Sequence, residues 1–265
     1  MRIHRIYLPE LNRGANVVIG SEAQHLAQVL RVVPGVPVRA FDGCGKEADG
    51  AVLTVETGRV VIELREPNSG RLEAGIAVTV AISLLKGDKL ADVVRQCTEL
   101  GAVSFRPLLS RRRDVPELSA NKLERLRRVA REAAKQSGRS VVPLVAEAVA
   151  LPDLEVDGLA LVAQPGAGST LLTVLGGGLQ RRDAPETRLQ RTNEVGATRP
   201  PGHDSGSSAA EKITVVTGPE GGFTAEEVSD LESRGARAVR LGARVLRAET
   251  APVAMLAALL VPEAL

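Results

Sequence analysis

The order of hydrophobic and polar positions divides the chain into two parts. Residues 1–72 contain short β-like apolar runs at 36–41, 51–54 and 59–64, and Asp42-Gly43 and Thr57-Gly58 separate these runs at hairpin spacing. A single helix is expected over residues 22–30, where Ser21 can serve as the N-cap. The pattern predicts a small β-barrel or sandwich module.

Beyond the polar stretch 65–75, expected strands alternate with expected helices. Residues 76–85 form a near-continuous apolar run, which is typical of a strand buried on both faces. Further strands are expected at 103–109, 159–163 and 213–217, and helices at 88–100, 121–136, 224–234 and from about 249 onward. This alternation predicts a parallel α/β sheet covered by helices. We therefore predict two domains, 1–72 and 75–265.

Residues 176–211 break the second pattern. They are rich in Gly, Pro, Ser, Arg and Thr and contain almost no large apolar side chains, so they cannot bury enough surface to order themselves. We expect a mobile insertion here. Its arginines could contact RNA, and a solvated loop without a partner is the alternative.

Composition excludes several classes of protein. The 265 residues are 44% hydrophobic, enough for a sizeable core, but only 2% aromatic, which argues against single-strand binding on aromatic platforms. Two distant cysteines and three isolated histidines have no metal-ligand spacing, so we expect no metal. No apolar run resembles an export signal or a membrane span, and we expect a cytoplasmic protein with reduced thiols.

The stretch TGPEGGF at 217–223 follows the apolar run 213–216. Its three glycines allow a close approach to the backbone, and Thr224 and Glu227 have the spacing of a capping box just beyond. The stretch matches neither a P-loop nor a dinucleotide fingerprint, and Glu220 would repel phosphate. An uncharged or cationic ligand fits this loop, and a tight turn without a ligand is the alternative.

Two further stretches carry charge. In residues 241–260 a polar loop precedes a strongly apolar helix; capping would account for Glu249 and Thr250 but leaves Arg244 and Arg247 without a role. Between Arg106 and Arg139, eleven Lys or Arg residues face four acidic residues, a local net charge of +7 in a chain whose total is +2. This is either a solvated helix face or a phosphate-binding surface.

Taken together, the chain resembles the ribosomal small-subunit methyltransferase E family, uridine-N3 RNA methyltransferases of the SPOUT superfamily. The resemblance rests on KGDK at 86–89, TELGA at 98–102, REAAKQSGRS at 131–140, TGPEGGF, and LGARVLRAETA at 241–251. HLAQVLRVVPG at 25–35 and FDG at 41–43 resemble the N-terminal module of the family.

The resemblance implies a SPOUT domain with a deep C-terminal trefoil knot, preceded by a PUA-like β-barrel. It also implies S-adenosylmethionine as cofactor, a homodimer, and a substrate uridine in the decoding region of 16S rRNA, within the assembled small subunit. Neither a membrane nor a metal is expected to take part.

The same resemblance assigns residues to three roles. The expected cofactor contacts are Leu161, Pro165, Gly218, Glu220, Gly221, Leu241, Gly242, Val245, Leu246 and Arg247. The catalytic candidates are Arg111, Arg113, Arg139 and Arg247 as cations near the uracil oxygens, with Glu99 or Glu132 as proton acceptor or orienting group. The expected RNA contacts are Arg2, His4, Arg5, His25, Arg31, Arg39, Lys86, Arg112, Arg125 and Arg128.

Some of these residues have plain structural alternatives. Glu99 could have no role beyond pairing with an arginine at the end of its helix, and His25 could simply pack within its helix. Lys86 could simply cap the helix expected at 88–100. Two other functions also remain open for the whole chain. One is a non-catalytic RNA-binding assembly factor, and the other is a SPOUT methyltransferase that acts on another RNA.

Overall fold

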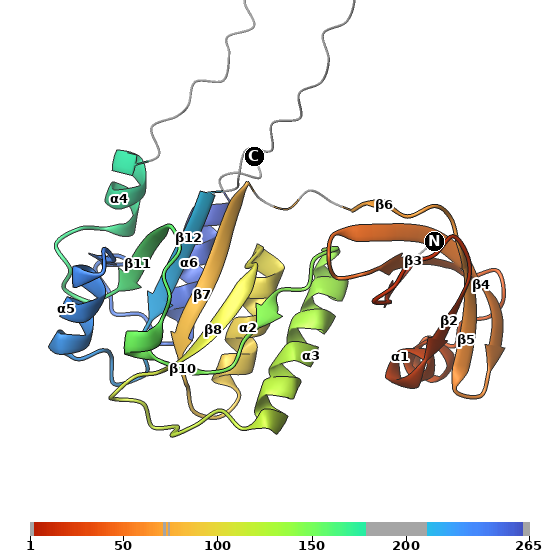
Figure 1. The fold of residues 1–265 in the computed structure, drawn as a ribbon, viewed down its shortest axis with the longest axis horizontal. Coiled ribbons are helices and arrows are strands. Elements are labelled where there is room, and N and C mark those ends of the chain that lie inside the picture. The colour runs from red at the N-terminus through yellow and green to blue at the C-terminus, as the bar shows by residue number, and fades with distance from the viewer. Residues whose placement is uncertain (1–2, 71–72, 74, 179–210, 262–265) are drawn as a thin grey trace, which may run out of the picture.

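Two β-sheets lie side by side in the computed structural model, which describes residues 3–70, 73, 75–178 and 211–261 (Figure 1). Within these residues, the N-terminal part forms a six-stranded sheet and the remainder a seven-stranded sheet with helices. Helix α3 lies between the larger sheet and the N-terminal sheet. The expected insertion at 176–211 falls almost entirely outside the described residues.

The larger sheet is parallel throughout, as the alternating pattern predicts. Its strand order is β10-β8-β7-β12-β11-β13, with β9 paired to β8, so β12 lies between β7 and β11. The strands are β7 (Ile76–Ser83), β8 (Ser104–Leu109), β9 (Leu144–Val145), β10 (Val149–Ala150), β11 (Leu159–Ala163), β12 (Glu211–Thr217) and β13 (Arg237–Val239).

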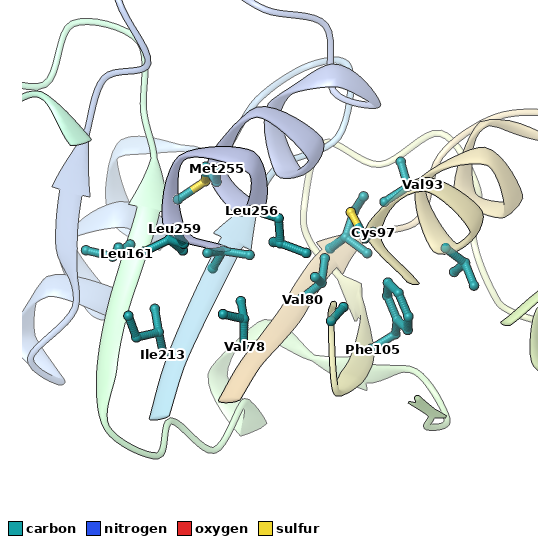
Figure 2. Packing of buried hydrophobic residues seen from close by; sticks show 14 of the residues in the cluster. Val78, Val80, Val93, Cys97, Phe105, Leu161, Ile213, Met255, Leu256 and Leu259 are labelled. Atoms are coloured by element: carbon teal, nitrogen blue, oxygen red, sulfur yellow. The ribbon is translucent and has the colours of Figure 1, made fainter. Parts of the chain in front are cut away.

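Helices cover both faces of this sheet, which explains its near-continuous apolar strands. On one face Val78, Val80 and Ile213 pack with Cys97 of α2 and Met255 of α6, as Figure 2 shows. The opposite face packs against α5 and the short helix η2 (Leu151–Asp153). The helices are α2 (Lys89–Leu100), α3 (Ala120–Ser137), α4 (Leu171–Gly178), α5 (Ala225–Ser233) and α6 (Thr250–Leu260).

The helix ends confirm most of the capping signals in the sequence. Helix α2 stops at Gly101, whose φ of 115° favours glycine, and α5 begins with the complete capping box of Thr224 and Glu227. The N-cap expected at Ser21 is wrong. Helix α1 (Gly20–Gln24) begins after Ile19 without a side-chain cap and continues as the π-helix η1 (His25–Val29).

The N-terminal sheet runs in the order β1-β3-β4-β5-β2, with β6 paired to β4. Both expected hairpins are present, since β3 pairs antiparallel with β4 and β4 with β5. Strands β1 and β2 were not predicted, because their apolar alternation is short. The strands are β1 (His4–Tyr7), β2 (Gly14–Ile19), β3 (Pro37–Phe41), β4 (Lys46–Glu56), β5 (Arg59–Leu64) and β6 (Asn68–Ser69).

A buried arginine joins the two sheets at the end of α3. Arg139 donates to the backbone carbonyls of Thr98 and Ala102, both at 2.8 Å, and to the Glu73 carboxylate at 2.6 Å. Its own carbonyl accepts a hydrogen bond of 2.9 Å from Arg5 in β1. Because Arg139 is only 8% exposed, its charge is almost entirely neutralised and hydrogen-bonded inside the protein.

Further polar contacts support the same junction. Lys135, only 6% exposed, donates to Glu22 of α1 at 2.7 Å, and Ser140 donates to Glu47 of β4 at 2.8 Å. The guanidinium of Arg131 lies over the ring of Tyr7, 4.7 Å from its centroid. These contacts fix the N-terminal sheet against α3.

Replacing Arg139 by alanine should lower the free energy of unfolding by about 3 kcal/mol, because it leaves Glu73 and two backbone carbonyls without their partner. Urea unfolding of the wild type and the variant measures the difference. Arg128→Ala, on the exposed face of the same helix, should change stability by less than about 0.5 kcal/mol. Equal effects of the two substitutions would contradict a structural role for Arg139.

Candidate functional site

The carboxyl ends of β11, β12 and β13 meet at one edge of the parallel sheet, and a cavity of about 600 Å³ opens there. Its size lies in the usual range for small-molecule sites. The loops after these three strands supply most of its lining. Nine of the ten residues expected to contact a cofactor line it, namely Pro165, Gly218, Glu220, Gly221, Leu241, Gly242, Val245, Leu246 and Arg247.

Leu161 is the exception, and its expected contact is wrong within this chain. It lies in the middle of β11, is 0% exposed, and packs in the core beneath the cavity, as Figure 2 shows. The strand residue that does line the cavity is Ala163, followed by Gln164 and Pro165. Only the last residue of a parallel strand and those after it reach the edge of the sheet.

The glycine loop forms one wall of the cavity. Gly222 has a φ of 68° and closes a turn by donating its N–H to the carbonyl of Pro219 at 2.9 Å. A Cβ on Gly221 would lie 3.2 Å from both the Cβ and the carbonyl oxygen of Arg112. A side chain at position 221 would therefore push the loop or residue 112 aside by a few tenths of an ångström.

The loop after β13 forms the opposite wall. Residues 242–245 are exposed, and Gly242 has a φ of 114°. The capping role expected for Glu249 is wrong: this residue occupies the N-cap position of α6 but makes no capping hydrogen bond. Its carboxylate lines the cavity instead.

A lysine links the two walls. Nζ of Lys89, the first residue of α2, lies 2.9 Å from Oε1 of Glu220 and 3.6 Å from Oε2 of Glu249. Burial would raise the pKa of Glu220, but the hydrogen bond from Lys89 and backbone donors outweigh it and hold that pKa below its ordinary value. The hydrogen bond to Glu220 raises the pKa of Lys89 in turn. Both groups are charged at neutral pH.

The arginine triplet after β8 lies beside the glycine loop. Arg112 donates to the carbonyl of Gly221 at 3.3 Å, and the backbone N–H of Arg111 donates to Glu227 at 2.7 Å. Arg113 donates to the carbonyl of Ser110 at 2.7 Å. The structure therefore places Arg111, Arg112, Arg113 and the cavity-lining Arg247 at the same edge of the sheet.

Three of the catalytic candidates lie elsewhere. Glu99 is at the C-terminal end of α2, where it pairs with Arg95 at 3.5 Å, and Glu132 is in the last third of α3. Arg139 contacts Thr98 and Ala102 at that same end of α2. Because α2 starts at the cavity and runs back to the amino ends of the strands, all three lie at the opposite edge of the sheet. One chain therefore does not bring these three residues to the cavity, and their catalytic roles stay predictions.

The expected RNA contacts that the structure describes fall into three groups. Arg31, Lys86, Arg112, Arg125 and Arg128 are exposed, although Lys86 pairs with Asp114 and Arg125 with Asp88. Arg5 and Arg39 are engaged internally: Arg5 contacts Glu47 and the Phe41 ring, and Arg39 contacts Glu47 and Asp49. His4 and His25 are half-buried, and Arg2 lies outside the described residues.

Lys89 and Thr217 are among the cavity-lining residues that were not expected contacts. Lys89 belongs to the KGDK stretch, and Thr217 is the last residue of β12; both line the cavity. Thr217 ends a buried strand and Lys89 begins the helix that follows another, and such positions at strand ends indicate a site in a parallel sheet. What the sequence did not reveal is that β7 and β12 are neighbours, which brings Lys89 to Glu220.

The sequence matches a known protein family over most of its length. Residues 72–260 match the model of the RNA methyltransferase domain family. The ribosomal RNA small subunit methyltransferase E of a Synechocystis species is 34% identical over 97% of this chain and 77% of its own length. This chain belongs to the ribosomal RNA small subunit methyltransferase E family. The Bacillus subtilis member is 29% identical over 91% of this chain and 88% of its own.

A solved structure of the family has the same fold. The Neisseria gonorrhoeae ribosomal RNA small subunit methyltransferase E, bound to S-adenosyl methionine, superposes with a TM-score of 0.78 at 27% identity and covers 97% of each chain. In the part of the chain that the structure describes, no group of His, Cys, Asp or Glu side chains is arranged to hold a metal ion. Among those same residues no helix has the length and hydropathy to span a membrane.

Substituting Lys89 by methionine should destabilise the protein in a pH-dependent manner. The lowered pKa of Glu220 contributes stability above its ordinary pKa, and this contribution is lost as the pH falls through the folded-state value. The difference in unfolding free energy between wild type and variant should therefore be largest near pH 7 and shrink towards about pH 3. Urea unfolding at both pH values measures it; an unchanged difference would contradict the ion pair.

Proposed function

We propose that this protein is an S-adenosylmethionine-dependent rRNA methyltransferase that methylates N3 of a uridine in the decoding region of 16S rRNA. The observation that carries the proposal is the cavity at the carboxyl edge of the sheet, lined by nine of the residues expected to contact the cofactor. The similarity to a family structure bound to S-adenosyl methionine supports the choice of cofactor.

The residues of the cavity suit this cofactor. S-adenosylmethionine carries a sulfonium cation, an ammonium group and a carboxylate but no phosphate, and the cavity is lined by charges of both signs: the carboxylates Glu220 and Glu249, and the cations Lys89, Arg240, Arg244 and Arg247. Leu241, Val245 and Leu246 offer apolar surface for an adenine ring, and the glycine loop offers backbone groups. When bound, the cofactor supplies an activated methyl group.

Methylation at N3 requires the imide proton of uracil to pass to solvent water while the nitrogen is aligned with the methyl group, and S-adenosylhomocysteine is the leaving group. Negative charge then develops on the two uracil oxygens, and cations placed beside them lower the barrier. Arg111, Arg113 and Arg247 are the candidates at the correct edge of the sheet, with Arg247 in the cavity wall itself. Their role is to position the base and to stabilise this charge.

The remaining expectations belong to the same proposal. The position of β12 between β7 and β11 supports a trefoil knot in the C-terminal part, and the mixed N-terminal sheet supports a PUA-like barrel in a domain covering residues 1–72. The homodimer that the resemblance implies is part of the same proposal. The substrate is the assembled small subunit in the cytoplasm.

Gly221→Val should weaken binding of S-adenosylhomocysteine by at least tenfold, because the added side chain clashes with Arg112 and displaces the wall of the cavity. Calorimetric titration measures both affinities. Gly75→Val is the matched control, since a Cβ there meets nothing within 4 Å and the residue is remote from the cavity. Equal affinity of the Gly221 variant and the wild type would contradict the assignment of the cavity.

The substrate is tested by methyl transfer to three RNAs: unmethylated small ribosomal subunits, free 16S rRNA and tRNA. The expected product is 3-methyluridine at one position of 16S rRNA in the subunits, identified by mass spectrometry of nuclease fragments. Faster methylation of tRNA would favour a methyltransferase for another RNA. RNA binding without any methyl transfer would favour an assembly factor.

A further inference from the structure

The helical segment of the N-terminal part ends in a strained backbone conformation. Arg31 has a φ of 50°, and it is the one non-glycine residue with a positive φ in the part of the chain that the structure describes. This left-handed conformation is unfavourable for any residue with a Cβ. Helix ends that adopt it usually have glycine there, as α2 and α3 do at Gly101 and Gly138. A glycine would therefore be more stable than an arginine at position 31.

The core of the N-terminal sheet imposes this conformation. The π-helix η1 closes with the N–H of Leu30 donating to the carbonyl of His25 at 3.0 Å, and the N–H of Val32 donates to the carbonyl of Leu26 at 3.1 Å. Leu26 and Val32 are both buried in one core cluster, against which Leu30 also packs. The turn at residue 31 reverses the chain so that these apolar residues reach the core. It needs a left-handed backbone there but no property of an arginine side chain.

The side chain of Arg31 has no task within this chain. It is exposed, and among the described residues no hydrogen bond or ion pair engages it. Glu22 is the only acidic residue in 20–36, and Lys135 holds its carboxylate at 2.7 Å. The guanidinium is therefore available to an anionic partner. Strained backbone and π-helical turns both occur preferentially at functional sites, and here they occur together.

The surface around Arg31 has the character of a nucleotide contact. Val29 and Val33 lie on either side of it in sequence and are 67% and 59% exposed. A nucleotide presents a phosphate to a cation and the faces of its sugar and base to apolar side chains. Helix α1, which η1 continues, lies in the lower part of Figure 1, as do the carboxyl ends of β7 and β12.

We propose that Val29, Arg31 and Val33 form a contact site for one nucleotide of the substrate RNA, with Arg31 bound to its phosphate. This rests on the proposed function, because it presumes that the substrate is RNA. The site differs from Arg5 and Arg39, whose guanidinium groups are engaged inside the N-terminal sheet. Stability favours glycine at position 31, whereas RNA binding requires a cation there.

This opposition gives the test its two readouts, which are the thermal unfolding midpoint and the affinity of the full chain for free 16S rRNA. Arg31→Gly should raise the midpoint by about 2 °C, because it relieves the strain. The same variant should bind rRNA about fivefold more weakly, as expected for loss of one charge-assisted contact. The slope of log affinity against log salt concentration should become shallower by about 0.7 to 0.9, the contribution of one phosphate.

Two further substitutions at this position separate charge from backbone. Arg31→Ala keeps the Cβ and removes the charge, so it should weaken rRNA binding as much as Arg31→Gly does without raising the midpoint. Arg31→Lys keeps both, and its rRNA affinity should stay within about twofold of wild type. The control Arg237→Ala removes an exposed positive charge at the start of β13, and it should change the rRNA affinity by less than about twofold.

The outcomes separate this contact from the proposed function. If Arg31→Gly and Arg31→Ala bind free rRNA with wild-type affinity and salt slope, the contact is overturned and the proposed function stands. A loss that appears only with assembled small subunits would also overturn it, and would indicate a ribosomal protein as the partner. A lower midpoint in Arg31→Gly would refute the strain. A wild-type protein that binds S-adenosylhomocysteine but no rRNA would overturn the proposed substrate together with this contact.

Discussion

Parallel pairing of β7, β12, β11 and β13 is the constraint on which the site depends. It directs the carboxyl ends of strands distant in sequence to one edge, where the loops at 164–165, 218–223 and 240–249 surround one cavity. The same pairing starts α2 at that edge, so Lys89 reaches the glycine loop. The buried apolar strands stabilise this geometry, while the loops carry the chemistry.

A second constraint concerns the N-terminal sheet. The QSGRS stretch at the end of α3 supplies Arg139 and Ser140, which are buried in contacts with Glu73, Arg5 and Glu47. These residues resemble catalytic or RNA-binding ones in sequence, because they are polar and cluster with arginines. In the structure they hold the two sheets in a fixed relation. A rigid relation of this kind would set how far a bound RNA must reach to enter the cavity.

Local signals in the sequence predicted most of the fold. Gly101 and the pair Thr224 and Glu227 marked helix ends, and Asp42-Gly43 marked a hairpin, because caps and turns depend on a few neighbouring residues. The order of the strands depends on pairing across long stretches of chain, which no local pattern encodes. For this reason Lys89 was missed.

The same limit explains the misplaced site residues. Leu161 belongs to the correct strand but lies too early in it to reach the edge of the sheet, a difference of two residues from Ala163. Glu99 and Glu132 lie on helices that run away from the cavity, and their motifs do not reveal at which end they fall. The sequence does not show that Arg5 pairs with Glu47 and Arg39 with Asp49, so both arginines were expected to be available for RNA.

The most direct test of the central claim is a crystal structure of the protein grown with S-adenosylhomocysteine. The ligand should lie between the glycine loop at 218–223 and the loop at 240–249. Density for the ligand at any other place, or an empty cavity at a saturating concentration of ligand, would contradict the assignment of this edge of the sheet as the cofactor site.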